Sequence, residues 1–167
     1  PPCTIEGPKP SMKTLLATAR ACALLATPMT HADTSPAAAK PGAVLLAPWT
    51  GPYGGVPPFD RAQVTDLQPA LEAGMAAQLA EIDRIVNDPA APTFDNTIAA
   101  MERTGRALDR SITVYGIYSS TLNDEAVQAV EREMAPKLAA FSDQITQNPQ
   151  LFERIAKVYE TREKSSL

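Results

Sequence analysis

The sequence is nearly devoid of the side chains on which most enzyme chemistry depends. Its one histidine is His31 and its two cysteines are Cys3 and Cys22, so residues 33–167 contain neither type. Histidine and cysteine are the main zinc ligands in proteins, and histidine is the side chain best suited to proton transfer near neutral pH. We therefore assign no catalytic, cofactor-binding or metal-binding residue to this sequence.

Aromatic residues and positive charge are also scarce. Aromatics make up 5% of the sequence, and residues 33–167 carry 12 Lys and Arg against 18 Asp and Glu, a net charge of −6 without any cationic cluster. Nucleic-acid binding depends on a cationic surface, so no nucleic-acid partner is predicted. Abundant alanine and few β-branched runs indicate a helical protein.

The amino-terminal 32 residues read as two processing segments. Residues 1–11 are a proline-rich upstream remnant, and residues 12–32 have the positive charge, apolar run and small residues of a signal peptide cleaved after Ala32. Arg20 lies close to the apolar run and leaves an amphipathic organelle presequence as the alternative. The run is too short for a stable membrane anchor, so we predict an exported, periplasmic protein in which His31, Cys3 and Cys22 have no role.

A flexible linker is predicted for residues 33–44, followed by the main body at 45–167. Within residues 43–60, repeated proline and glycine argue against a helix or a regular strand. The segment nevertheless holds many large apolar side chains, which favours an extended stretch pinned to a larger body, with Trp49 and Phe59 as anchors. A partly ordered linker is the alternative.

Beyond Asp60, apolar residues recur every three or four positions, which predicts an all-α antiparallel array of about four helices. The expected caps are Asp66, Thr93, the pair Asn123-Asp124, and Asn148, and Pro136 is expected to kink the third helix or divide it in two. The expected buried positions, helix by helix, are Leu71, Met75, Leu79, Ile82 and Val86; Ile98, Met101, Gly105, Leu108, Ile112, Tyr115, Ser119 and Leu122; Val127, Val130, Met134, Leu138, Phe141 and Ile145; and Leu151, Phe152, Ile155, Val158 and Tyr159.

No group of polar residues in this body predicts chemistry. The close carboxylate pairs are one or two positions apart and do not share a helix face, and Gly51, Gly54 and Gly55 lack the Lys-Ser/Thr of a phosphate loop. Tyr115 and Tyr118 are interpreted as packing residues. Two ordinary helix ion pairs are expected at spacings of three and four, between Glu81 and Arg84 and between Glu102 and Arg106.

Several separated segments resemble one family in its own order. These are residues 46–60, 66–72, 93–98, 130–138 and 147–152. They are similar to the amino-terminal region of the peptidyl-dipeptidase and oligopeptidase A group, zinc metallopeptidases related to thimet oligopeptidase. The likeness extends over about Leu45 to Leu167 and is nearest to bacterial peptidyl-dipeptidases, which release dipeptides from peptide carboxyl termini.

The resemblance implies a much longer parent enzyme whose zinc motif H-E-x-x-H and substrate-binding histidine and tyrosines lie downstream. Zinc would belong to that parent, and this chain alone is expected to bind none and to be inactive. The present segment would form one wall of a channel that admits short peptides, the substrates of the missing catalytic domain. The alternative is a free-standing exported helical binding module without enzymatic activity.

Overall fold

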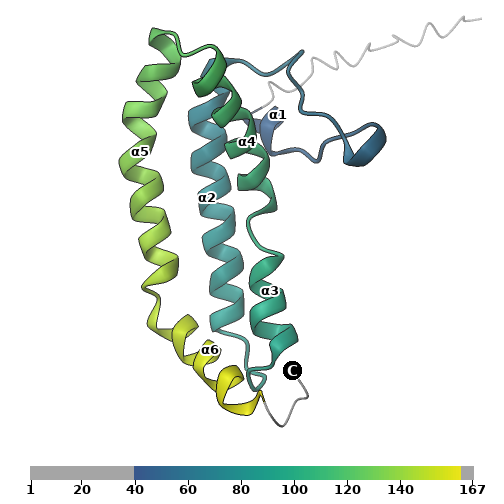
Figure 1. Cartoon of the computed structure of the whole chain (residues 1–167), viewed down its shortest axis with the longest axis vertical. Helices are drawn as coiled ribbons and strands as arrows, with labels where there is room; N and C mark the ends of the chain where they lie inside the picture. Colours follow the sequence, from purple (N-terminus) through teal and green to yellow (C-terminus); the bar gives the residue numbers. More distant parts are fainter. Residues whose placement is uncertain (1–39, 163–167) are drawn as a thin grey trace, which may run out of the picture. The chain divides into compact units, whose positions relative to one another are not determined.

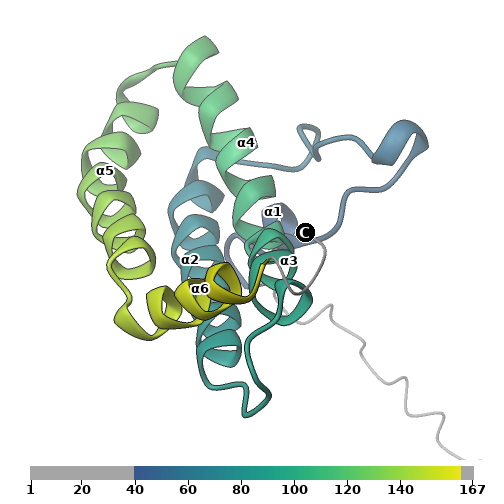
Figure 2. The same cartoon turned by 60° about the horizontal axis from the view of Figure 1, so that its bottom comes forward.

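A computed structural model describes residues 40–162, and within them every named element is helical (Figure 1). The predicted leader and the linker up to residue 39 lie outside the described residues. Helix α2 (Val64–Val86) lies at the centre, with α5 (Glu125–Thr146) on one side and α3 (Ala99–Glu102) and α4 (Arg106–Thr121) on the other. Helix α6 (Pro149–Thr161) crosses the lower end, as Figure 2 shows. The all-α prediction is confirmed.

Helix α2 begins earlier than the sequence indicates. Gln63 is the cap, and Asp66 is the third residue of the helix, where its Oδ2 accepts the backbone N–H of Gln63 at 3.1 Å. The prediction of Asp66 as cap was therefore wrong, because the glutamine and the aspartate form a reciprocal capping box. The other Asp66 oxygen, Oδ1, accepts the N–H of Gly42 at 3.1 Å and ties the preceding segment to α2.

The second predicted helix is interrupted at Gly105. It begins with the wide turn η2 (Phe94–Ile98), capped by Thr93 as predicted, continues as α3, and restarts as α4 after Gly105 adopts φ 78°. This break changes the helical phase, so the inward face of α4 is Leu108, Ser111, Val114 and Tyr118. Ile112 and Leu122, predicted on a continuous seam, are exposed instead.

Pro136 does not divide the third helix, so the expectation of two separate helices was wrong. Helix α5 runs through Pro136, which is exposed to solvent. On a solvent-facing side, water can satisfy the carbonyl that the proline leaves without a partner. Of the predicted pair Asn123-Asp124, Asp124 caps α5 through a hydrogen bond of 2.9 Å to a backbone N–H group. Asn148 caps α6 as predicted, through a hydrogen bond of 3.0 Å.

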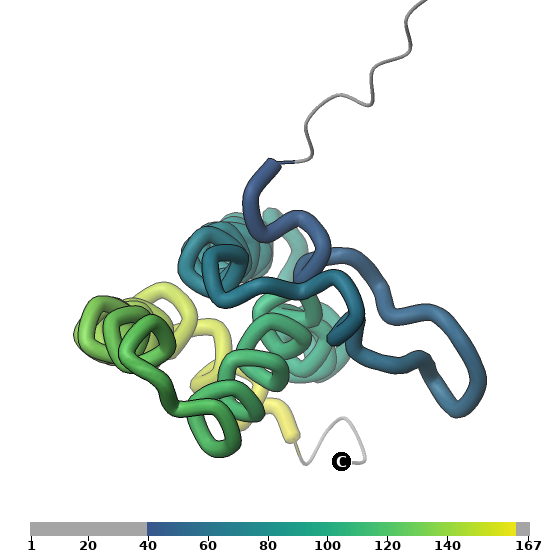
Figure 3. The backbone as a smooth tube through the Cα atoms, turned by 90° about the horizontal axis from the view of Figure 1, so that it is seen from above, coloured from purple at the N-terminus to yellow at the C-terminus, as the bar shows by residue number. Residues whose placement is uncertain are grey.

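The proline- and glycine-rich segment is pinned to the helices at its two ends. It contains the one-turn helix α1 (Ala43–Leu46), contrary to the expectation of no helix there, and the tight turn η1 (Pro52–Gly54). Helix α1 takes in two residues of the stretch assigned to the linker. Between the ends, the segment forms a loop that reaches away from the helices (Figure 3).

The anchors of this segment are Leu45 and Trp49. Leu45 is fully buried, and Trp49 packs on the same cluster, as predicted. Phe59 is 42% exposed and stacks on Tyr118 with ring centroids 6.3 Å apart, so it contacts the body without being buried. The Arg110 guanidinium donates to the Leu46 carbonyl and adds a polar tie to α4.

The core consists of three clusters that follow one another along α2. The upper cluster joins α1, α2, α4 and α5 around Leu45, Leu67 and Val114, and the middle one packs Leu71, Met75, Leu108 and Met134. The lower cluster contains Ile82, Ile85 and Leu151 and brings α6 against the end of α2.

Candidate functional site

The described residues give no support for a metal or acid–base centre. No group of three or more His, Cys, Asp or Glu that could hold a metal ion occurs among residues 40–162. Tyr118 is a packing residue whose hydroxyl donates to the Ala62 carbonyl at 3.0 Å. Tyr115 is partly buried, and burial, with a smaller contribution from Glu131, raises the pKa of its hydroxyl. A phenol with a raised pKa stays protonated and is poorly suited to act as a base.

The two predicted ion pairs are absent from the structure of these residues. Glu81 turns toward the Gly105 break, where its Oε2 accepts the backbone N–H of Gly105 at 2.8 Å. Glu102 and Arg106 lie on opposite sides of that break, so a spacing of four no longer places them on one helix face. The Glu81 carboxylate therefore accepts a hydrogen bond from the left-handed turn at Gly105, and it does not pair with Arg84 as the sequence spacing predicted.

The polar contact between α2 and α5 is a bridge centred on Lys137. Its ammonium lies 2.6 Å from Glu72 Oε1 and 2.8 Å from Glu133 Oε1. The hydrogen bond from Lys137, followed by one from Gln68, lowers the pKa of Glu72, and the two carboxylates raise the pKa of Lys137. All three charged side chains of this bridge are partly exposed, and each has an oppositely charged partner within it. We interpret it as a link between helices.

Two hollows lie at the lower end of the array, where α2, η2, α3 and α6 meet. A cavity of 660 Å³ opens between the end of α2 and α3, with Glu81, Arg84, Asn96 and Arg103 among its lining residues. Its arginines are already engaged in part, because Arg84 donates to the Ala80 carbonyl and Arg103 to that of Ala99. We assign no ligand to this open hollow.

Arg154 holds the neighbouring loop against α6. Its guanidinium is buried, donates to the Asp88 carbonyl at 2.9 Å and lies 3.8 Å from the Asp88 carboxylate. Sequence reasoning did not single out this residue. The available signal was its position between Leu151 and Val158, at the spacing of the inward face of α6.

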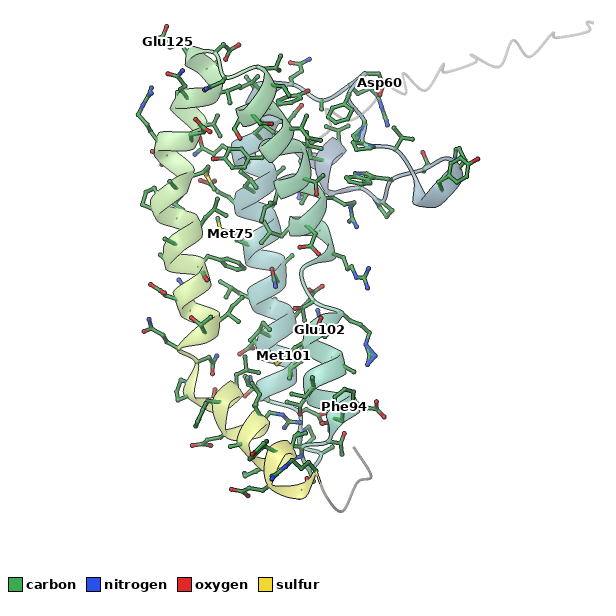
Figure 4. All side chains as sticks on the ribbon, viewed as in Figure 1. Asp60, Met75, Phe94, Met101, Glu102 and Glu125 are labelled. Carbon is green, nitrogen blue, oxygen red and sulfur yellow. The ribbon has the colours of Figure 1, made fainter. Side chains whose placement is uncertain are left out.

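A second hollow at this end is apolar. It has a volume of 260 Å³ and is lined by Met101, Ile145, Leu151, Phe152 and Ile155, with Thr146 and Asn148 at its polar edge. Figure 4 shows Met101 and Phe94 on the η2–α3 segment at the same end of the array as α6. Phe152 and Tyr159, both predicted to be buried, are 70% and 64% exposed. This surface is the strongest candidate for an interaction.

No helix among residues 40–162 is both long enough and apolar enough to cross a membrane.

The chain is similar to two curated peptidases. It is 35% identical over 106 residues, 64% of its length, to a dipeptidyl carboxypeptidase from Salmonella typhimurium. It is 32% identical over 111 residues, 66% of its length, to a dipeptidyl carboxypeptidase from Escherichia coli. In each case the matched stretch spans only 16% of the relative. No protein-family model matches the sequence.

Proposed function

We propose that this chain is the amino-terminal part of a zinc-dependent peptidase of the peptidyl-dipeptidase type, in the wider group related to thimet oligopeptidase. The observation that carries the proposal is the 35% identity over 106 residues to a dipeptidyl carboxypeptidase. The confirmed helical architecture is consistent with the amino-terminal region implied by the resemblance. The complete protein would hydrolyse short peptides and release dipeptides from their carboxyl termini.

Within that protein, this part would be non-catalytic. The donor set of residues 40–162 does not fit zinc, since these residues include no His or Cys and their Asp and Glu side chains form no group suited to a metal ion. The residues that hold zinc would therefore come from elsewhere in the polypeptide. The role proposed for this segment is mechanical: a rigid helical wall that limits the substrate channel to short, unfolded peptides.

We also propose that the protein is exported to the periplasm. The support is the signal-like sequence of residues 12–32, with a cleavage position after Ala32. Amino-terminal sequencing of the protein recovered from a periplasmic extract tests this, and a product that retains Met12 and stays in the cytoplasm would contradict it.

A segment exchange tests the proposed function. In the Escherichia coli relative, the segment corresponding to residues 40–162 of this chain is replaced by those residues, and dipeptide release from a short peptide is measured with added zinc. We expect the chimera to be active and the 167-residue chain alone to be inactive. A folded but inactive chimera would contradict the channel-wall role, and zinc-dependent dipeptide release by the isolated chain would contradict the non-catalytic assignment.

A further inference from the structure

Helix α6 carries two adjacent rows of side chains, of which only one is buried throughout in the described structure. The inner row, Leu151, Arg154 and Val158, is buried. The outer row, Phe152, Ile155 and Tyr159, has the same spacing of three and four, so it also forms a continuous stripe. Ile155 is partly buried, whereas Phe152 and Tyr159 are mostly exposed.

The apolar hollow lies beside this outer row. Met101 comes from α3, Ile145 from the end of α5, and Phe152 and Ile155 from α6. Beneath them is the lower core cluster, so the hollow has a packed, apolar floor. A ridge of side chains next to a groove is the surface on which another helix packs, and contiguous exposed apolar surface of this kind marks an interaction site.

We propose that a helix from the part of the polypeptide that follows α6 packs on the outer row and fills this hollow with apolar side chains. The proposal rests on the proposed function, which places the chain in a longer protein. In a polypeptide as long as the relatives, of which the match covers 16%, most of the chain is available for this contact. Consecutive helices usually pack beside each other, which favours the next helix over more distant ones.

The chemistry of the hollow restricts its occupant. None of its lining residues is charged. A charged side chain placed there would lose its hydration without gaining a partner, at a large cost in free energy. The occupant is therefore an uncharged helix face with apolar residues three and four positions apart.

The size of the stripe argues against a second copy of this chain as the occupant. Helix α6 has 13 residues and is therefore about 20 Å long, so one face about 10 Å wide offers about 200 Å². A stable interface between separate proteins needs about 800 Å² from each partner. A segment of the same polypeptide is held at high effective concentration and can dock on a much smaller surface.

Cysteine accessibility tests this docking. Phe152→Cys places a thiol on the outer row, and the matched control Lys157→Cys places one on an exposed position of the same helix, away from that row. Both are made in the 167-residue chain with Cys3 and Cys22 replaced by serine, and in the chimera described above. Reaction with a thiol reagent is followed at each position by peptide mass spectrometry.

In the isolated chain we expect both positions to react rapidly. In the chimera, reaction at position 152 should slow at least about tenfold while position 157 changes less than about twofold. Equal reaction at both positions of a folded chimera, or a chimera that only aggregates, would overturn the docking. So would a protected position 152 in an isolated chain that sediments as a dimer, because the occupant would then be a second copy.

The activity of the chimera is a separate measurement. An active chimera with an accessible position 152 rejects the docking and leaves the proposed function standing. An inactive chimera with a protected position 152 supports the docking and contradicts the proposed function.

Discussion

At the scale of single residues, Trp49 reports whether the proline-rich segment is seated on the helices. It is the sole tryptophan, it packs on the cluster around Leu45, and its indole nitrogen is shielded from solvent. We expect its fluorescence to be blue-shifted in the folded chain and to move to longer wavelength when the chain unfolds. An emission maximum that does not change on unfolding would reject the anchoring of the segment.

Leu45→Ala provides the companion variant. Leu45 is fully buried in the cluster that Trp49 covers, so its truncation should cost about 2–5 kcal/mol of folding stability. The folded variant should also show a smaller blue shift than the parent. Chemical denaturation followed by the same fluorescence gives both values, and an unchanged free energy of unfolding would contradict the buried position of Leu45.

Residue spacing alone misassigned several polar side chains. Glu81 and Arg84 have the spacing of a helix pair, yet Glu81 binds the Gly105 N–H, which a left-handed glycine leaves available. Arg154 was assigned no role, but it holds the loop at Asp88. In both cases the partner lies on another element, and a pattern read along one helix cannot include it.

At the scale of elements, two helical glycines should respond in opposite directions to substitution by alanine. A Cβ at Gly74 would lie 2.9 Å from Leu108 Cα, part of the α4 backbone, whereas a Cβ at Gly116 would meet nothing within 4 Å. We expect Gly74→Ala to destabilise the chain by about 1–3 kcal/mol, because α2 and α4 must move apart. Gly116→Ala should stabilise it by about 0.5–1 kcal/mol through helix propensity and a less flexible unfolded chain.

Urea denaturation of the two variants beside the parent checks this pair. If Gly74→Ala stabilises the chain as much as Gly116→Ala does, the close approach of α2 and α4 is wrong. The apolar periodicity did not single out Gly74, because the small residues on the predicted seam were Gly105 and Ser119.

The bridge between α2 and α5 should make stability depend on pH. The hydrogen bond from Lys137, then that from Gln68, lowers the pKa of Glu72 in the folded state. Its contribution to stability is therefore present above the unfolded pKa of about 4.3 and is lost as the pH falls through the lower folded value. For Lys137 the sign is opposite: its raised pKa means that its contribution is present below the unfolded pKa and is lost as the pH rises through the folded value.

Thermal unfolding of Glu72→Gln tests the acidic limb. The variant should melt below the parent at pH 7, and the difference should shrink as the pH falls below about 4, where the parent carboxylate is protonated as well. Glu153→Gln is the control, since it removes an exposed carboxylate that is not paired with a cation in the described structure. A difference between Glu72→Gln and the parent that is constant from pH 7 to pH 3 would contradict the bridge.

At the scale of the whole molecule, the apolar periodicity was sufficient to predict the class of fold. The predicted face of α5 contains both of its buried residues, since α5 is one uninterrupted helix whose phase is constant. The predicted face of α2 contains three of its seven buried residues. The prediction of buried residues failed in α4, because the break at Gly105 changes the phase of the helix. It also failed in α6, whose apolar stripe is wider than the surface that the neighbouring helices bury. Both failures concern how elements meet.

The amino-acid sequence was sufficient to predict a helical fold, to show that no histidine or cysteine follows residue 32, and to reveal the resemblance of several segments to a peptidase family. These properties depend on residue type, order and local spacing. The tertiary structure was needed to show that Leu45 anchors the proline-rich segment, that α4 packs closely against Gly74, and that Phe152 and Tyr159 of the outer row of α6 are mostly exposed. Whether a side chain is buried depends on which helices pack against it. Each of these three features involves contacts between residues that are far apart in the sequence.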